Sequence, residues 1–281
     1  EGYEVTQAPF PIISYKQAML EFGSDKPDLR NPLRIIDLTD FFQRCTFKPF
    51  HGKTVRAIKV HADMSKGFHE KLLKFAQSIG MGGLGYLEVM EDKSYKGPID
   101  KFIPDDMKEE IRETAGLEVG DTIFFIADNE KNAALYAGQI RTALGERLDL
   151  IEKNSFKFCY INDFPMYEYD KETKKMEFTH NPFSMPQGGL EALETMDPEE
   201  ILAYQYDIVC NGVELSSGAV RNHDMKIMVK AFEIAGYTEE DLKEKFGALY
   251  NAFQFGAPPH AGMAPGVDRM IMLLRDEENI R

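Results

Sequence analysis

Apolar and polar positions between residues 33 and 148 follow a period of two in some stretches and a period of three to four in others. The first period is typical of strands and the second of helices. The pattern predicts strands over Val55–His61, Tyr86–Met90 and Thr122–Ala127. It predicts helices around Phe68–Ile79, over Asp105–Thr114 and over Asn132–Leu148. A segment of about 115 residues has the size of an ordinary domain, and we expect a self-contained α+β unit here.

For two helices in the first 148 residues, the sequence predicts further details. Ser14 can cap a helix over Tyr15–Phe22, which Gly23 ends, and a charged loop over Gly23–Arg30 comes next. The long helix that closes the α+β unit is expected to turn three residues inward: Leu135, Ile140 and Leu144.

From residue 149 onward, longer apolar runs are separated by turn signals. Phe156–Glu168 is typical of a strand that Pro165 interrupts. Asp197-Pro198 is typical of a helix start, so a helix is expected from there to about Tyr206. Asn211-Gly212 between two apolar runs predicts a β-hairpin. Two more helices are expected, one from a capping box at Thr238 to about Phe255, and a final one with an apolar stripe at Val267, Met270, Ile271 and Leu274.

Charge is unevenly distributed along the chain. There are 33 Lys and Arg against 47 Asp and Glu, a net charge of −14. This excludes a general nucleic-acid coat, because phosphate binding depends on basic side chains. Residues 44–74 nevertheless hold eight basic and two acidic side chains, a local balance of +6. That segment could be a solvated face or a surface that meets phosphate.

The remaining composition narrows the class of protein. Three distant cysteines without a CxxC pair argue against a zinc ribbon or a disulfide framework, and they favour a reducing cytoplasm. No apolar run approaches the ~20 residues of a membrane span. The first residues are acidic and polar, unlike a secretory signal. Because the sequence does not begin with Met, we expect a piece of a longer protein.

One glycine-rich string has the wrong surroundings for a dinucleotide site. Gly80–Gly85 fits the pattern G-x-G-x-x-G, which binds dinucleotides when it comes after a strand and opens a helix. Here the string comes after a predicted helix and precedes a predicted strand. We therefore interpret these glycines as a helix end and a tight turn.

The predicted hairpin brings two acids together. With Asn211-Gly212 as its turn, Val209 is expected opposite Glu214, and Asp207 opposite Ser216. Asp207 and Glu214 would then lie diagonally on one face, about 7–8 Å apart. Such a pair could hold a magnesium ion together with substrate phosphates. It could equally be two solvated acids on an open sheet face.

An arginine near the end of the chain also allows two interpretations. Gly262–Arg269 leads into the last helix and places Arg269 in its first turn, where a positive charge opposes the helix dipole. An anionic ligand would explain that position, and so would neutralisation by the adjacent Asp268. Gly262 and Gly266 would let the backbone approach a ligand closely.

Five strings together resemble a known family. Gly-x-x-x-Gly-Val-Asp-Arg at residues 262–269 matches motif 3 of the class II aminoacyl-tRNA synthetases. With the other four, the whole chain resembles the bacterial-type aspartyl-tRNA synthetases, and residues 33–148 resemble that family's GAD insertion domain. The other strings are Gly23–Arg30, Ile161–Met166, Thr179–Phe183 and Asn211-Gly-Val-Glu214 with Gly218-Ala-Val-Arg221.

The resemblance implies roles for particular residues. The family's motif 3 arginine, here Arg269, contacts the γ-phosphate of ATP, and the backbone of Gly266, Val267 and Asp268 helps to seat adenine. The hairpin acids Asp207 and Glu214 bind Mg²⁺ and ATP phosphates. Arg221 pairs with the side-chain carboxylate of L-aspartate, a contact suited to a bidentate guanidinium. His180 also lies at the aspartate, although without the resemblance it would be interpreted as an ordinary loop histidine.

These roles imply a site geometry. Arg221 lies an odd number of positions from Glu214, so an uninterrupted strand would turn the two side chains to opposite faces. The family roles need both on one face. We therefore expect a bulge or break within Ser216–Ala219, where small residues tolerate it.

The resemblance also implies an architecture and a function. We expect a catalytic-core segment at 1–32, a GAD domain at 33–148, and at 149–281 part of a class II antiparallel sheet with flanking helices. The parent enzyme would activate L-aspartate with ATP, charge tRNA(Asp), and be a cytoplasmic homodimer. Motifs 1 and 2 do not appear in these 281 residues, so we expect the isolated chain to be inactive. The alternative is a non-catalytic GAD-domain fragment that only binds tRNA or protein.

Overall fold

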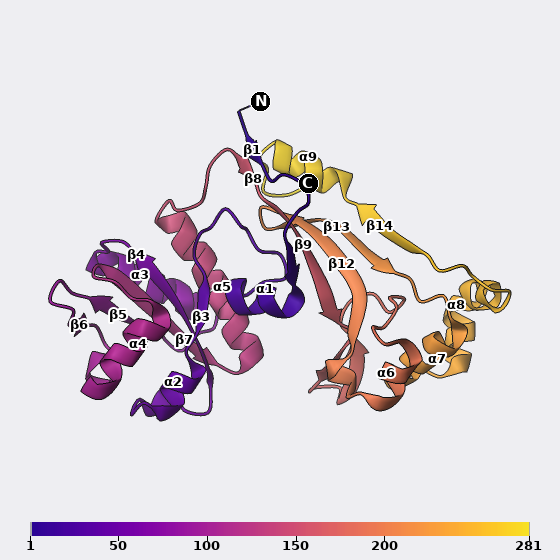
Figure 1. Cartoon of the computed structure of the whole chain (residues 1–281), viewed down its shortest axis with the longest axis horizontal. Coiled ribbons are helices and arrows are strands. Elements are labelled where there is room, and N and C mark those ends of the chain that lie inside the picture. The colour runs from indigo at the N-terminus through magenta and orange to yellow at the C-terminus, as the bar shows by residue number, and fades with distance from the viewer. Residues whose placement is uncertain (1, 281) are drawn as a thin grey trace. The chain divides into compact units, whose positions relative to one another are not determined.

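The computed structural model describes residues 2–280 and divides into two compact units. The first unit contains residues 2–4 and 17–156, and the second contains residues 5–16 and 157–280. Figure 1 traces the chain by colour through both units. The second unit therefore combines a short early segment with the whole later half of the chain, and each unit is mixed α and β.

The first unit is built on a five-stranded sheet with the order β3-β4-β7-β5-β6. Every neighbouring pair in it is antiparallel. The longest pairing joins β4 to β7 from Thr54 opposite Asp128 to His61 opposite Asp121. The strands are β3 (Ile35–Asp37), β4 (Thr54–His61), β5 (Gly85–Val89), β6 (Tyr95–Lys96) and β7 (Asp121–Asp128).

Helices cover both faces of this sheet. One core joins β4 and β7 to α3 and α5 through residues such as Ile58, Leu72 and Ile140. The other core lies on the opposite face and includes Phe42 of α2 and Ile111 of α4. The helices are α1 (Tyr15–Phe22), α2 (Thr39–Arg44), α3 (Lys66–Ser78), α4 (Lys108–Ala115) and α5 (Glu130–Arg147), with 3₁₀ turns η1 (Lys48–Phe50), η2 (Asp100–Phe102) and η3 (Asp105–Met107).

Most elements expected in this half are confirmed within one or two residues, and the predicted helix over Tyr15–Phe22 matches α1. The string at residues 80–85 does come after helix α3, and its last residue, Gly85, begins strand β5. The inward position of Leu135 was wrong, because this side chain is 44% exposed whereas Ile140 and Leu144 are fully buried. Helix α5 instead buries small residues such as Ala134 and Gly138.

The second unit contains another five-stranded sheet, with the order β14-β13-β12-β9-β2. β2 is parallel to β9, and the other neighbours are antiparallel. Two smaller strand pairs accompany the sheets, β10 with β11 and β1 with β8. The strands of the second unit are β2 (Ile12–Ser14), β9 (Phe158–Pro165), β10 (Tyr167–Asp170), β11 (Lys175–Phe178), β12 (Leu202–Cys210), β13 (Val213–Val220) and β14 (Ala261–Pro265). In the other pair, β8 (Ser155–Phe156) belongs to the first unit and β1 (Glu4–Val5) has one residue in each unit.

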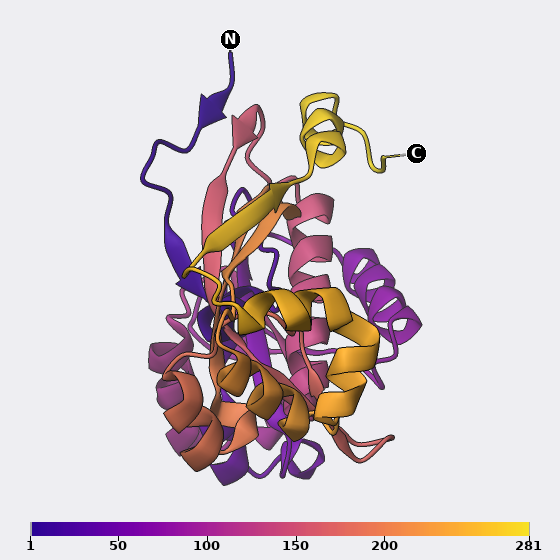
Figure 2. The same cartoon turned by 90° about the vertical axis from the view of Figure 1, so that its right-hand side faces the viewer.

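The helices of the second unit gather mostly at one end of its sheet. Phe232 of α7 packs with Leu242 and Tyr250 of α8, and Leu193 of α6 packs with Tyr167 of β10. Figures 1 and 2 show α8 and α9 at opposite ends of β14. The helices are α6 (Gly189–Thr195), α7 (Met225–Ile234), α8 (Glu239–Gln254) and α9 (Val267–Leu274), with a 3₁₀ turn η4 (Pro198–Glu200).

The helix expected from Asp197 to about Tyr206 was wrong. The Asp197 side chain does accept a hydrogen bond from the Glu199 amide, but only the single turn η4 forms. β12 then begins at Leu202. Its side chains alternate between more and less buried positions, and strands on both sides pair with it. Sheet pairing therefore overrides a local helix start. The Thr238 capping box and the break after Pro165 are confirmed.

None of the helices within residues 2–280 has the length and apolar character needed to cross a membrane.

Candidate functional site

The β12–β13 hairpin forms the centre of the candidate site. Asn211 and Gly212 have φ values of 52° and 84°, which is the geometry of a type I′ turn and suits Asn-Gly. The Asn211 side chain also accepts a hydrogen bond from the Lys157 amide at 2.9 Å. The predicted hairpin is confirmed, and Val209 lies opposite Glu214 as expected.

A one-residue bulge changes the register beyond this point. Ile208 pairs with Ser216 while Val209 pairs with Glu214, so Leu215 is an extra residue on β13. The expected pairing of Asp207 with Ser216 was wrong, because Asp207 lies opposite Ser217. A bulge exists on this strand, but its expected position within Ser216–Ala219 was wrong, because it lies one residue earlier, at Leu215.

The bulge places Arg221 on the same face as Glu214, as we expected. Asp207 shares a face with Val209 and hence with Glu214, and its partner Ser217 shares that face with positions 219 and 221. Asp207, Glu214 and Arg221 therefore occupy register positions on one face of the hairpin. β13 ends at Val220, and the Arg221 amide donates to the carbonyl of His260 at 2.9 Å.

Arg269 reaches this face from the last helix. Its Nη1 donates to the backbone oxygen of Glu214 at 2.8 Å and to Oε1 of the same residue at 3.1 Å. Within residues 2–280 its ion-pair partner is thus Glu214 and not the adjacent Asp268. The Arg269 side chain remains 46% exposed, so it stays accessible from solvent.

Two glycines allow this close packing of backbone. The amide of Gly266 donates to the carbonyl of Leu215 at 2.7 Å and joins the start of α9 to the bulge. A Cβ on Gly266 would lie 3.3 Å from that same carbonyl oxygen. A Cβ on Gly218 would lie 2.5 Å from the Tyr206 ring and 2.6 Å from the carbonyl oxygen of Gly262. The strand register at the site therefore requires small residues.

The acids on this face suit a cation that also binds phosphate. Asp207 is buried, with 3% exposure, and the Glu214 side chain is 23% exposed. Among the residues that the structure describes, no cluster of three or more His, Cys, Asp or Glu could hold a metal by itself. One or two carboxylates plus substrate oxygens are what Mg²⁺ usually takes. Asp207 and Glu214 fit such an ion.

His180 lies on the neighbouring loop. Its ring makes edge contacts with Phe164 at 4.7 Å and with Tyr15 at 6.2 Å between centroids. The adjacent Asn181 amide donates to the side chain of Gln205 at 3.4 Å, and Gln205 shares the face of Asp207 by strand parity. The loop of His180 is thus joined to the same face as the hairpin acids.

A segment that the sequence did not single out completes this end of the site. The amide of Met185 donates to Val220, and the amide of Tyr204 donates to Met185. Ser184 forms an isolated antiparallel bridge with Arg221. The chain before α6 therefore inserts between the ends of β12 and β13. The sequence of this segment does not alternate between apolar and polar residues. Only the hydrogen bonds in the structure show that it pairs with strands.

The cysteine beside the hairpin is not a nucleophile. Cys159 on β9 pairs with Val209 and is fully buried. Burial raises the pKa of its thiol to about 12, so it stays protonated near neutral pH. This agrees with chemistry that depends on positioning and charge.

Comparison with known proteins identifies the family to which this chain belongs. The family described as tRNA synthetases class II (D, K and N) matches residues 2–281, and the chain belongs to this family. The chain is 54% identical to the aspartate–tRNA(Asp/Asn) ligase of Ehrlichia ruminantium (strain Gardel), with 97% of this chain and 47% of that protein covered. It is also 54% identical to the ligase of the same name from Gluconobacter oxydans (strain 621H), with 100% and 48% covered. The ligase of that name from Rickettsia africae (strain ESF-5) is 51% identical, with 99% and 48% covered. The chain thus spans about half the length of these relatives.

Proposed function

We propose that this chain carries part of the aspartate-activating site of an aspartate–tRNA ligase that uses ATP. In this reaction a carboxylate oxygen of aspartate attacks the α-phosphorus of ATP, and the bond to the leaving pyrophosphate breaks. A tRNA hydroxyl then attacks the acyl carbon of the resulting aspartyl adenylate, an ester forms, and AMP leaves. The contact of Arg269 with Glu214 on the face of Asp207 and Arg221 is the observation that supports the proposal.

The ATP end of the site lies near the hairpin turn. Arg269 is positioned by Glu214 so that its exposed side chain can meet the terminal phosphate. Backbone groups of Gly266, Val267 and Asp268 would border the adenine. Asp207 and Glu214 would hold Mg²⁺, which supplies positive charge to the triphosphate as charge develops there.

The aspartate end lies farther along the same face. Ser217, which is opposite Asp207, and Arg221 are four residues apart, so their backbones lie about 13 Å apart at the usual strand rise. An arginine side chain and one small amino acid can bridge that span. The fork of Arg221 would bind the side-chain carboxylate of aspartate, with His180 beside it. A charged fork also discriminates against asparagine, which has no carboxylate there.

The relatives' name, with its two tRNAs, suggests that tRNA(Asp) and tRNA(Asn) both deserve testing as acceptors. We also propose that residues 33–148 form a GAD-type domain, and that residues 1–32 and 149–281 belong to the catalytic core. A cytoplasmic homodimer stays a prediction from the family.

Titration of the 281-residue chain with Mg·ATP tests the phosphate end. Arg269→Met should weaken ATP binding by about tenfold or more, because a charge-assisted contact to phosphate is lost. Arg275→Met is the matched control, since Arg275 lies at the end of the same helix α9 and is exposed. Equal ATP affinity in the two variants would contradict the role of Arg269.

Aspartate-dependent exchange of pyrophosphate into ATP by the whole enzyme tests the amino-acid end. Arg221→Leu should abolish exchange while ATP binding persists, because an unpaired carboxylate in a desolvated pocket costs roughly 3–5 kcal/mol. Exchange at the unmodified rate would remove Arg221 from the site. Failure of this chain to bind ATP, together with retained binding of tRNA, would favour the non-catalytic binding module instead.

A further inference from the structure

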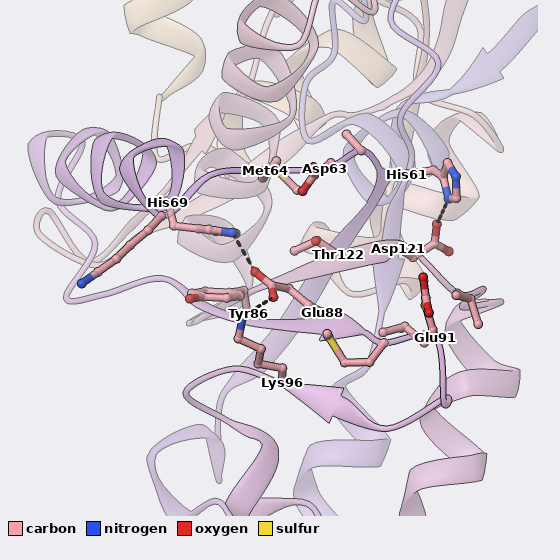
Figure 3. Close-up of a pocket in the computed structure, with 16 residues that line it drawn as sticks. His61, Asp63, Met64, His69, Tyr86, Glu88, Glu91, Lys96, Asp121 and Thr122 are labelled. Carbon is pink, nitrogen blue, oxygen red and sulfur yellow. Dashed lines mark hydrogen bonds and ion pairs between the residues drawn. The ribbon is translucent and has the colours of Figure 1, made fainter.

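The first unit contains a pocket to which the proposed ligase site contributes no residue. It lies where α3 begins and where β4, β5 and β7 meet, and has a volume of about 710 Å³. Figure 3 shows polar side chains from these elements around it. We propose that this pocket binds a small organic cation, an amine or guanidinium group on an aliphatic stem.

Glu88 is the central recognition group. It points into the pocket from β5, and its side chain is 23% exposed. Among the described residues, Oε1 of Glu88 lies 3.1 Å from Nε2 of His69, and Oε2 lies 3.5 Å from Nζ of Lys96. A carboxylate can accept about four hydrogen bonds, and charge-assisted ones are typically about 2.7–2.9 Å long. Glu88 therefore has capacity to accept further donors.

His69 is an independent sign of an incomplete site. It is only 8% exposed and lines the pocket. Among the residues that the structure describes, neither ring nitrogen has a hydrogen bond of good geometry, although Nε2 lies 3.1 Å from Oε1 of Glu88. Its ring stacks on Tyr86 at 4.1 Å with an interplanar angle of 10°, so it has little freedom to turn away. Figure 3 shows His69 and Glu88 directed toward one another. A buried polar group left in this state usually has a ligand or water to satisfy it.

Charge selects a cation over an anion. The carboxylates lining the pocket are Asp63, Glu88, Glu91 and Asp121, against the ammonium groups of Lys66 and Lys96. These carboxylates and ammonium groups together carry a charge of −2. Asp121 already accepts from the Glu118 amide and contacts His61, both at 2.9 Å, and Asp63 and Glu91 are exposed to solvent. Glu88 is therefore the partly buried carboxylate that remains as an acceptor.

The N-terminus of α3 lies beside the pocket, but it does not make the pocket favour an anion over a cation. The Ser65 side chain already accepts a hydrogen bond from the Phe68 amide and so caps α3. The negative balance of the lining further disfavours an anion at this point.

Apolar walls suit the stem of such a ligand. Met64, Met90 and Val119 line the pocket beside the acids, and Met90 and Val119 are about 40% exposed. Methylene groups of a lysine- or arginine-like stem would cover this surface while the charged end meets Glu88.

Lys96 occupies the position that the ligand's charge would take. It lies opposite Glu88 in the β5–β6 pairing, its side chain is 70% exposed, and its contact with Glu88 is long. An exposed pair of this kind contributes little, so a ligand can displace it. Removing the Lys96 charge should therefore tighten ligand binding, whereas removing the Glu88 charge should weaken it.

Two probes distinguish a free ligand from a side chain of a partner. Agmatine represents a free cation, and N-acetylarginine amide represents an arginine within a peptide. Each is titrated into the 281-residue chain at two salt concentrations, with backbone amide NMR shifts and calorimetry as readouts. Saturable binding with shifts confined to residues 61–69, 86–91 and 119–122 is expected. Preference for one probe then identifies the source.

Two charge-removing variants should change the affinity for the ligand in opposite directions. Glu88→Gln should weaken binding at least tenfold, and Lys96→Met should strengthen it severalfold. Glu113→Gln, an exposed acid on α4 outside the pocket, should leave affinity unchanged. Lys96→Met keeps the test valid if Glu88→Gln perturbs folding. Unsaturable shifts, or equal affinity in all three variants, would overturn the proposal.

Discussion

Replacing Gly138 by alanine should destabilise the first unit, although alanine is normally favoured in helices. Gly138 lies in the middle of α5, where a glycine costs about 0.5–1 kcal/mol relative to alanine. A Cβ there would lie 2.5 Å from the backbone oxygen of Gly23 and 3.2 Å from its Cα. The neighbour is backbone, so relief requires the chain around Gly23 to move.

The loop that follows Gly23 is firmly held at residues 28–33. Arg141, one turn farther along α5, is 3% exposed and donates to the carbonyls of Leu33 at 2.8 Å, Asn31 at 2.8 Å and Asp28 at 3.0 Å. Asn31 returns a bond to the Arg141 carbonyl at 2.9 Å. Burial lowers the pKa of Arg141 to about 10, so its guanidinium is still charged at pH 7–8. Displacing the loop would leave buried partners unsatisfied at about 1–3 kcal/mol each.

The magnitude is the balance of these opposing terms. Overpacking a tight contact costs about 1–3 kcal/mol, and displacement of even one Arg141 bond adds to it. Adding the loss of one such bond and subtracting the helix-propensity gain leaves a net destabilisation of about 1–5 kcal/mol. Gly67→Ala is the matched control, because Gly67 lies in helix α3 of the same unit and its Cβ would meet only Ser65 Oγ at 3.8 Å. It should be neutral or stabilising by up to about 1 kcal/mol.

Urea unfolding at pH 7.5, monitored by far-UV circular dichroism, measures both variants. Gly138→Ala should lower the midpoint of the transition and Gly67→Ala should not. Equal or higher midpoints for both would refute the reasoning, since they would mean that the α5–loop contact adapts at no cost.

Buried or capped groups give three further predictions. Tyr167→Phe should destabilise the second unit by about 1–2 kcal/mol in thermal unfolding, because the buried hydroxyl donates to the Ala231 carbonyl at 2.8 Å; an unchanged midpoint would contradict this. Thr238→Ala should cost about 1 kcal/mol through loss of the capping box with Asp241, and Thr238→Ser should largely restore it. A thiol reagent at pH 8 should label no cysteine of the folded chain and all three in urea, because all are buried and the pKa of Cys159 is raised to about 12; rapid labelling of folded protein would refute it.

Sequence patterns identified elements well where local and tertiary preferences agree. The Asn211-Gly212 turn and the Thr238 capping box each specify one geometry by themselves, and both are confirmed. The start at Asp197 failed because its local signal is satisfied by a single turn, while pairing with two strands makes the residues from Leu202 onward extended. Leu135 failed because α5 packs through small residues, a choice that counting large apolar side chains does not reveal.

The sequence named candidate residues for the site, but it could not supply the contacts between them. Glu214 and Arg269 were both identified, yet their contact depends on β14 pairing with β13, which no local pattern encodes. The insertion of Ser184 and Met185 beside Arg221 left no sequence signal. Contacts across long separations come from tertiary pairing, so residue types alone could not supply them.

The bulge at Leu215 connects the residue spacing in the sequence with the strand pairing in the structure. A seven-residue spacing between Glu214 and Arg221 is odd, and an unbroken strand would place their side chains on opposite faces. One extra residue restores the parity, and it does so near the turn, where the Leu215 carbonyl also accepts the Gly266 amide. The same irregularity therefore aligns Arg221 with Asp207 and anchors the start of the helix that carries Arg269. A spacing that looks incompatible with a strand becomes, through one inserted residue, the reason that distant charges share a face.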